Sequence, residues 1–291
     1  MKVLLTGATG FIGSHLCRQL ESAGHHVLPV SRRAGSGYDW SDASLQRGVT
    51  KADGVIHLAG ENLFAKRWST RQKEVLRSSR IDATKKLAAL VAKRKPSCFI
   101  SASAVGYYGP STSTRFDEAS PHGQDFLAGL CAEWEASTSA SAEAGVRTAV
   151  LRTGVVLGLG GGALAKMLPP FKFGVGGPLG NGKQWVSWIH IDDLTSLYLF
   201  LLENTAPKGA FNGTAPQPVT MKTFASALGH ALHRPAIFAV PAPILRLALG
   251  EVADILLTGQ QVEPRRTREA GFQFKFADIN KALVDILGRT S

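Results

Sequence analysis

The chain opens with an apolar run, a glycine turn and an amphipathic stretch, and this pattern of hydrophobic and polar positions recurs through its first half. Residues 2–6 form a short apolar run typical of a buried strand, and residues 14–20 carry apolar positions at helical spacing. Further apolar runs predict strands at 25–30, 53–58, 97–103 and 146–152, with helices at 69–93 and 124–144. Repeated strand and helix over residues 1–152 predicts a Rossmann-type, doubly wound, mostly parallel α/β sheet. Residues 34–52 are too few for a complete helix, strand and helix, so this part of the fold is expected to be abbreviated.

The pattern of long alternating strands and helices ends after residue 157. Glycine-rich segments at 158–162 and 174–182 interrupt it, and the predicted elements become shorter. They are a strand at 184–191, a helix at 192–203, a short strand at 211–212 and helices at 220–233, 241–257 and 277–288. We therefore predict a nucleotide-binding domain over 1–157, to which a segment of about 184–215 returns. A smaller α+β substrate domain is predicted over 158–291, with the substrate cleft between the two.

The glycine turn is the candidate cofactor site. In a strand–turn–helix context, Gly7 permits the tight turn, Gly10 lets the backbone approach a pyrophosphate, and Gly13 lets the helix pack on the strand. The amide groups at the start of the helix then face the phosphates. The alternative is an ordinary glycine-rich turn of an α/β protein. The predicted contacts in this turn are Gly7, Thr9, Gly10, Phe11, Ile12 and Gly13.

The residues after the second predicted strand indicate which dinucleotide binds. An acidic residue there would bind the ribose 2′-hydroxyl, whereas arginine accommodates a 2′-phosphate. Ser31, Arg32 and Arg33 come first, and no carboxylate appears before Asp39. The sequence therefore predicts NADP, the alternative being a solvated arginine pair in a loop.

Later strand ends supply further candidates. Small residues at 58–60 suit the rim of a parallel sheet where ligands bind, whereas His57 lies inside the apolar run and is expected to be a core histidine. Arg80, on a predicted helix, either forms an exposed ion pair or reaches the cofactor or substrate. The strand at 97–103 ends in hydroxyls at Ser101 and Ser103, and a turn carrying Tyr107 and Tyr108 follows it.

Composition narrows the class of protein. The 291 residues are 44% hydrophobic and 19% charged, as in a globular protein, and none of their apolar stretches is long enough to span a membrane. The net charge of +11 is dispersed, which favours an anionic cofactor or substrate over nucleic acid. Cys17, Cys98 and Cys131 have no metal spacing, so we expect no metal site. With no room for a signal peptide, we expect a cytoplasmic monomer or homodimer without a membrane partner.

Together these segments resemble the extended short-chain dehydrogenase/reductase (SDR) superfamily. More narrowly, the chain looks like its atypical epimerase/dehydratase-like group, the nucleoside-diphosphate-sugar epimerase-like proteins, some of which carry a "cell division inhibitor" label. The matching segments are 6–13, 53–60, 101–103 and 188–193 for the superfamily and 59–62, 104–109, 152–157 and 167–171 for the group. The resemblance implies an NADP-binding domain followed by a small C-terminal domain. The candidate cofactor contacts beyond the turn are Ser31, Arg32, Arg33, Leu58, Ala59, Gly60, Glu61, Arg80, Ser101 and Ala102.

The chain departs from the superfamily at the catalytic dyad. Superfamily enzymes use a tyrosine and a lysine four residues later, beside a serine, so that the phenol can shuttle a proton. Ser103 matches the serine, but Phe126 and Leu130 stand at the places of the dyad. Either Tyr107 or Tyr108 supplies the acid in an oxidoreductase or epimerase-like enzyme, or the chain is a non-catalytic NADP(H)-binding sensor or scaffold. Among nearby carboxylates, Glu133 and Glu135 are expected to be solvated. The substrate is expected to be a small anionic or carbonyl compound, or one resembling a nucleotide sugar.

Overall fold

A six-stranded, wholly parallel sheet forms the centre of the computed structural model, which describes residues 1–31 and 37–289. Its order, β2-β1-β3-β4-β6-β10, is that of a doubly wound sheet, and the predicted fold class is confirmed. The strands are β1 (Lys2–Thr6), β2 (His26–Val30), β3 (Gly54–His57), β4 (Cys98–Ala104), β6 (Arg147–Thr153) and β10 (Gly209–Gly213).

The chain reverses its direction of travel across the sheet after β2. β1 pairs with β2 on one side and with β3 on the other, so that Thr6 lies between Val30 and His57 in register. In open parallel sheets, ligands bind outside the carboxyl ends of the strands at such a switch point. The glycine turn follows Thr6 directly, and the topology therefore places it at the expected ligand crevice.

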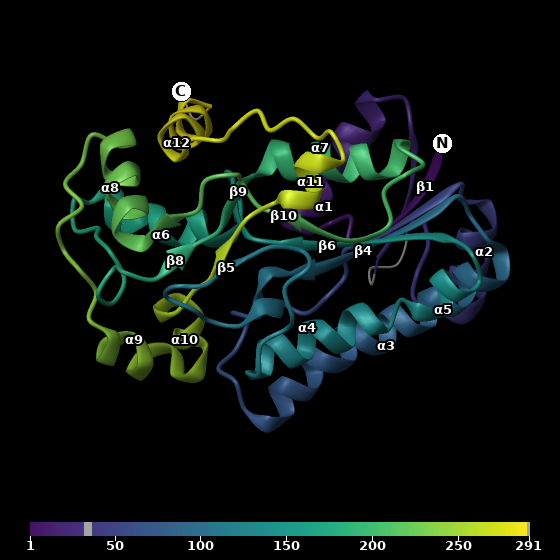
Figure 1. The fold of residues 1–291 in the computed structure, drawn as a ribbon, viewed down its shortest axis with the longest axis horizontal. Helices are drawn as coiled ribbons and strands as arrows, with labels where there is room; N and C mark the ends of the chain where they lie inside the picture. Colours follow the sequence, from purple (N-terminus) through teal and green to yellow (C-terminus); the bar gives the residue numbers. More distant parts are fainter. Residues whose placement is uncertain (32–36, 290–291) are drawn as a thin grey trace.

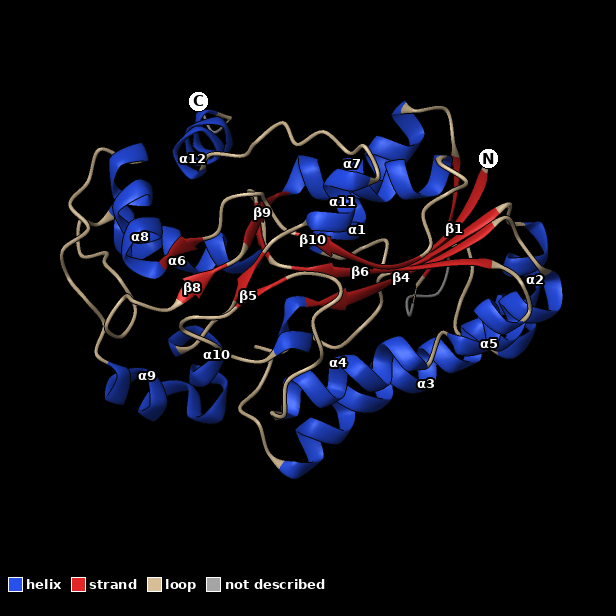
Figure 2. Ribbon diagram, viewed as in Figure 1, coloured by secondary structure: helices blue, strands red, loops and turns tan. Residues whose placement is uncertain are grey.

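Helices cover both faces of this sheet, as Figures 1 and 2 show. Alternation along β1 divides its side chains between the two layers: Val3 and Leu5 pack in one apolar cluster, and Leu4 packs in another. One face carries α1 (Phe11–Ser22) and α7 (Ile191–Glu203), which pack together, and the other carries α2 (Asp42–Lys51), α3 (Thr70–Arg94), α4 (Phe126–Ala136) and α5 (Ser139–Glu143).

Two stretches of the first half differ from a complete strand-and-helix pattern. In the described part of the stretch after β2, which was expected to be abbreviated, the chain forms a parallel bridge between Val30 and Tyr38 and the unpredicted helix α2. The helix predicted over 124–144 is interrupted between α4 and α5. There the hydroxyls of Ser137 and Thr138 donate to the carbonyls of Glu133 and Glu135 and compete with the helical pattern.

The second half of the chain builds a smaller lobe beside the carboxyl ends of the strands (Figure 2). Trp188, Phe224 and Leu283 are buried in its own apolar cluster. The short strands outside the central sheet pair as β7 (Val155–Leu157) with β9 (Trp188–His190) and β8 (Trp185–Val186) with β11 (Val219–Thr220), while β5 (Arg115–Phe116), from the first half of the chain, pairs with β12 (Gln261–Val262). The helices of the lobe are α6 (Gly162–Lys172), α8 (Met221–Ala231), α9 (Ala242–Leu249), α10 (Ala253–Leu257), α11 (Arg265–Glu269) and α12 (Ile279–Gly288), with 3-10 turns at Val105–Tyr108 and Gly250–Val252. The strand predicted at 184–191 is thus two short strands and the start of α7, and the 3-10 turn at Gly250–Val252 divides the helix predicted at 241–257. The domain boundary after residue 157 stays a prediction.

Candidate functional site

The three glycines of the turn have different steric surroundings. Gly7 has a positive φ of 73°, and a Cβ there would lie 3.0 Å from the carbonyl carbon of Leu58. A Cβ on Gly13 would lie only 2.1 Å from the carbonyl oxygen of Gly7, so helix α1 can pack this closely on the turn only with glycine there. A Cβ on Gly10 would meet only the Gly7 oxygen, at 3.3 Å. The other side of Gly10 is therefore open, as close approach of a ligand to the backbone requires.

A cavity of about 500 Å³ lies on the open side of the turn. Helix α1 begins here without a side-chain cap, so its first amide groups are available to an anion. The loop at 158–162 closes around Phe11, since a Cβ on Gly161 would lie 2.5 Å from the Phe11 ring. The smaller lobe thereby supplies one wall. The lining residues are Thr9, Gly10, Phe11, Ser14, His15, Arg18, Leu159 and Gly160.

A buried hydroxyl joins the ends of β1 and β3. Thr6 Oγ1 accepts from the amides of Leu58 and Ala59, each at 3.2 Å, and lies 2.6 Å from His57 Nδ1. Burial lowers the pKa of His57 to about 4, so the ring is neutral at pH 7 and Nδ1 can accept the Thr6 proton. His57 is the buried core histidine that the apolar run predicts, and it holds the predicted cofactor residues Leu58 and Ala59 against the glycine turn.

Arg80 lies behind the next segment of the rim. Its guanidinium is buried and donates to the carbonyls of Glu61, at 2.8 Å, and Leu76, at 3.2 Å. A Cβ on Gly60 would lie 3.3 Å from the guanidinium carbon. Of the two alternatives from sequence, the exposed ion pair is wrong, because Arg80 is buried against the backbone of Gly60 and Glu61. Contact of Arg80, Gly60 and Glu61 with a cofactor stays a prediction.

The remaining cofactor candidates are only partly placed. Ser31 is buried at the end of β2, and its amide donates to the Tyr38 carbonyl at 2.9 Å. Arg32 and Arg33 lie outside the described residues. In β4, Ser101 pairs in register with His57, and the Ser101 hydroxyl donates to the carbonyl of Ala102 at 3.2 Å.

Ser103 leads into a buried charged network that the sequence does not predict. Its hydroxyl donates to the Glu135 carboxylate at 2.7 Å, and the Arg152 guanidinium donates two hydrogen bonds of 2.8 Å to the same carboxylate. Burial alone would lower the pKa of Arg152, but the hydrogen bonds and charge of Glu135 outweigh it, and the pKa is raised. The expectation that Glu135 is solvated is therefore wrong, whereas Glu133 does form an exposed pair with Arg77.

Tyr107 and Tyr108 differ in their exposure to solvent. Tyr108 is buried, and its hydroxyl donates to Asn212 at 2.7 Å and accepts from Arg152 at 3.0 Å. Burial raises the pKa of Tyr108 to about 12. The proposal that Tyr108 supplies a catalytic proton does not fit this position. Tyr107 is half-buried, and the centroid of its ring lies 3.4 Å from the Arg152 guanidinium carbon. Its hydroxyl has no partner among the described residues.

Phe126 and Leu130, which stand at the positions of the usual catalytic dyad, belong to an apolar cluster and not to the network of Ser103, Glu135 and Arg152. Phe126 packs edge-on against Trp68, with ring centroids 5.2 Å apart, and Leu130 is buried in the same apolar cluster. The neighbouring stripe of α4, four residues apart at Leu127, Cys131 and Glu135, faces β4 and the 3-10 turn instead. That spacing is the sequence signal that points to Glu135.

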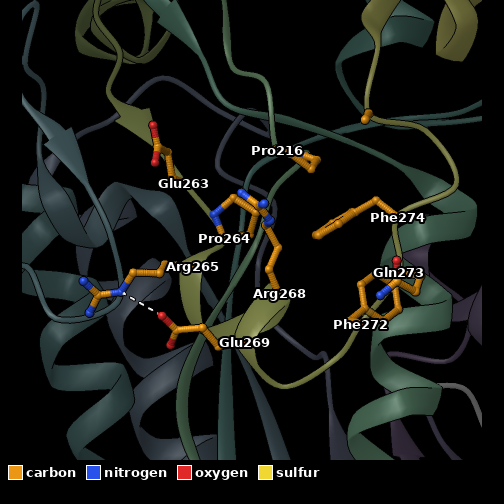
Figure 3. Close-up of a pocket in the computed structure, with 10 residues that line it drawn as sticks. Pro216, Glu263, Pro264, Arg265, Arg268, Glu269, Phe272, Gln273 and Phe274 are labelled. Carbon is orange, nitrogen blue, oxygen red and sulfur yellow. Dashed lines mark ion pairs between the residues drawn. The ribbon is translucent and has the colours of Figure 1, made fainter.

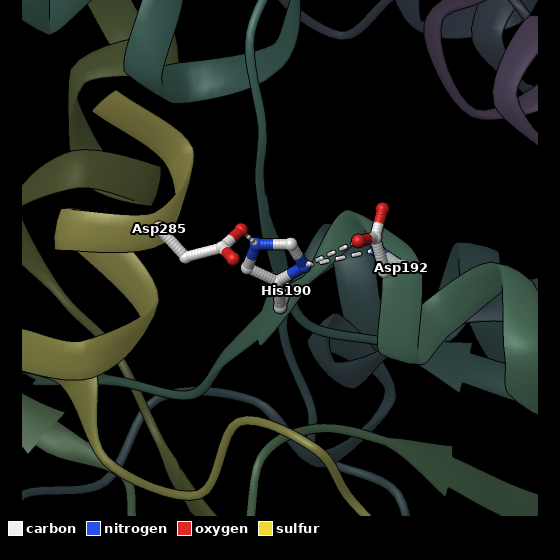
Figure 4. A group of neighbouring side chains, drawn as sticks. All are labelled: His190, Asp192 and Asp285. Atoms are coloured by element: carbon white, nitrogen blue, oxygen red, sulfur yellow. Dashed lines mark hydrogen bonds and ion pairs between the residues drawn. The ribbon is translucent and has the colours of Figure 1, made fainter. Parts of the chain in front are cut away.

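One group of side chains has the composition of a metal site. His190, Asp192 and Asp285 offer ligand atoms within 4.8 Å of one another. Figure 4 shows the two carboxylates beside opposite nitrogens of the ring, and Arg289 pairs with both aspartates, at 2.6 and 2.7 Å. His190 Nδ1 also accepts from the Asp192 amide at 3.0 Å. Because Arg289 already pairs with both carboxylates, this geometry fits a set of ion pairs that joins the end of α12 to the start of α7 better than a metal centre.

A second cavity, of about 660 Å³, opens beside α11 (Figure 3). It contains none of the predicted site residues. Arg265 on its wall pairs with Asp117, and Phe272 and Phe274 pack edge-on beside it. Its lining residues are Pro216, Glu263, Pro264, Arg265, Arg268, Glu269, Phe272, Gln273, Phe274 and Ala277.

The parallel sheet, the glycine turn at its switch point and the open face of Gly10 define a dinucleotide-binding α/β protein. The profile of the NAD dependent epimerase/dehydratase family matches residues 3–212, and the chain belongs to that family. A domain of unknown function, DUF1731, matches residues 240–286. The resemblance to atypical members of the SDR superfamily is thereby confirmed.

Particular relatives match over nearly the whole chain. The epimerase family protein SDR39U1 of mouse is 44% identical over 99% of this chain and 100% of its own length. YfhF of Bacillus subtilis, an epimerase family protein, is 38% identical over 99% and 98%. The crystal structure of human SDR39U1 (isoform 2) with NADPH has a TM-score of 0.92 at 37% identity, covering 99% of each chain.

No helix in the described ranges, 1–31 and 37–289, is both long and apolar enough to cross a membrane.

Proposed function

We propose that the chain binds NADP(H) at the switch point of the sheet, with the pyrophosphate over Gly10 and the amides at the start of α1. The open face of Gly10 and the adjoining cavity support this placement. The human relative crystallised with NADPH supports the choice of dinucleotide. Leu58 to Glu61 and Arg80 form the neighbouring wall, and Arg32 and Arg33 meet the 2′-phosphate.

The reaction that this site supports best is NADP(H)-dependent oxidoreduction, or epimerisation through a transient oxidation, of a small carbonyl or nucleotide-sugar-like compound. NADPH supplies the hydride when it is bound. Tyr107 supplies the proton to the carbonyl oxygen, and Ser103, at the end of β4, is connected to it through Glu135 and Arg152. The observation that carries this assignment is the Tyr107 hydroxyl, which is unpartnered among the described residues and has the Arg152 cation against its ring. The Arg152 cation comes from β6 and not from the dyad position on α4, and its charge would favour the ionised phenol, as the lysine does in the superfamily.

The test is NADPH oxidation with a panel of aldehydes, ketones, quinones and nucleotide sugars, with a separate readout for epimerised products. Tyr107→Phe should lower turnover by roughly 10²–10⁴, the usual contribution of a general acid, with little change in NADPH affinity. Tyr108→Phe is the matched control. It should lower stability by about 1–3 kcal/mol, because Asn212 and Arg152 lose a buried partner, but should leave turnover by the folded protein near normal. Full turnover in Tyr107→Phe would refute the assignment.

Cofactor choice is tested separately by calorimetry. NADP(H) should bind at least about tenfold more tightly than NAD(H), and Arg32→Ala should shrink that difference. Equal affinities for the two cofactors in the unmodified protein would contradict the assignment of the 2′-phosphate site.

A non-catalytic NADP(H) sensor or scaffold is the second candidate. The apolar packing of Phe126 and Leu130 favours it, because the usual proton-transfer dyad is replaced by core side chains. Tight NADPH binding without turnover of any compound in the panel would select it. A cytoplasmic location and a monomeric or homodimeric state stay predictions.

A further inference from the structure

The end of the smaller lobe exposes large apolar side chains to an extent unusual for a protein surface. Phe173 is 83% exposed, Leu247 80% and Ile237 75%. Such exposure in one region marks an interaction surface more often than chance. We call the whole set the apolar face: Phe173, Val175, Ile237, Phe238, Ile244 and Leu247.

The backbone holds the segments of the apolar face together. The stretch after α6 pairs with the stretch before α9, since the Phe238 amide donates to the Gly176 carbonyl at 3.2 Å and the Val240 amide to the Pro178 carbonyl at 3.0 Å. Helix α9 follows directly, and none of its eight residues is buried. Ile244 and Leu247, three residues apart, project from one side of it. In Figure 1 these segments lie at one end of the molecule.

Cations outnumber carboxylates around the apolar face. Residues 158–190 and 214–250 contain six Lys or Arg and no Asp or Glu, and of the carboxylates that follow α9, Asp254 pairs with Arg246 at 3.1 Å and Glu251 with Lys73. Of these cations, Lys172 and Arg234 lie next to each other, because Arg234 Nε donates to the Lys172 carbonyl at 3.3 Å. Neither pairs with a carboxylate in the described part of the chain. The part of the face that adjoins Lys172 and Arg234 is therefore both apolar and cationic.

We propose that the apolar face docks on an anionic lipid surface, with the aromatic and aliphatic side chains in the headgroup region and the cations against lipid phosphates. Apolar residues that protrude singly and are ringed by Lys and Arg are the features of interfacial membrane binding. A second copy of the chain fits less well, because the cations Lys172 and Arg234, which pair with no carboxylate of the described residues, would meet their own copies. The expectation from sequence of no membrane partner rested on the lack of spanning segments, and interfacial docking requires no such segment.

The experiment is sedimentation of the full chain with vesicles of phosphatidylcholine, with or without phosphatidylglycerol. The unmodified protein should bind only the anionic vesicles, and high salt should weaken binding. Phe173→Ser with Leu247→Ser should reduce partitioning at least about tenfold, and Lys172→Gln or Arg234→Gln about fivefold each. Val284→Ser, at an exposed position of α12, and Lys51→Gln, at the end of α2, are the matched controls and should bind as the unmodified protein does.

Two results would overturn the proposal. One is a failure to bind anionic vesicles by protein that still has its native circular dichroism. The other is a concentration-dependent dimer, seen by ultracentrifugation, that Phe173→Ser with Leu247→Ser abolishes. That result would assign the face to contact between copies of the chain.

Discussion

Glu135→Gln tests the buried network by removing one charge while keeping the shape of the side chain. In the folded protein the Glu135 and Arg152 side chains are 14% and 5% exposed and share two hydrogen bonds of 2.8 Å. Without the carboxylate charge, the further partners that the described residues give Arg152 are the Tyr108 hydroxyl, the Glu118 carbonyl at 3.5 Å and the Tyr107 ring, and none of these groups carries a charge. Removing one member of a buried pair leaves an uncompensated charge, so the free energy of unfolding should fall by about 3–5 kcal/mol.

The measurement is urea unfolding followed by tryptophan fluorescence and circular dichroism, with the two signals required to coincide. Glu133→Gln is the matched control, because its partner Arg77 is only 2.6 Å away but both side chains are nearly half exposed. That substitution should change stability by about 0–1 kcal/mol. Replacing both partners, as Glu135→Leu with Arg152→Met, should recover part of the loss, since no unpaired charge remains. Equal effects of Glu135→Gln and Glu133→Gln would refute the assignment of a buried network.

Two further predictions concern the glycine turn and the buried histidine. Gly13→Ala should abolish measurable NADPH binding in calorimetry, because its Cβ would lie 2.1 Å from the Gly7 oxygen, whereas Gly129→Ala, with open space around it, should bind normally and be slightly more stable. Since burial lowers the pKa of His57 from 6.5 to about 4, the unfolded chain binds the proton more readily, and stability should be lost as pH falls from 6.5 to 4, by about 3 kcal/mol in full. His57→Gln should flatten that part of the stability curve, although His190, shifted in the same direction, keeps some slope; an unchanged slope would contradict the prediction.

Much of the fold could be predicted because its signals are local. The apolar runs and the helical spacing predict every strand of the sheet and most of the helices on it, although α2 was not predicted, and the spacing of Gly7, Gly10 and Gly13 predicts the turn at its switch point. The predictions were wrong where elements are short or interrupted. One example is the break after α4, where the hydroxyls of Ser137 and Thr138 compete with the backbone hydrogen bonds of the helix. In the second half, Gly250 ends α9 inside the helix expected at 241–257, and Ser187 separates β8 from β9 inside the strand expected at 184–191.

The sequence by itself determined the class of fold, the position of the glycine turn and the loss of the usual dyad at Phe126 and Leu130, because each depends on residue type at fixed spacing. Only the tertiary structure shows that Tyr108 is buried whereas Tyr107 is half-buried, and only it revealed the buried position of Glu135. The parallel register sets Ser103 beside Arg152, and α4 then places Glu135 against both. Access to solvent and charge pairing arise between segments far apart in the chain, which local spacing does not encode.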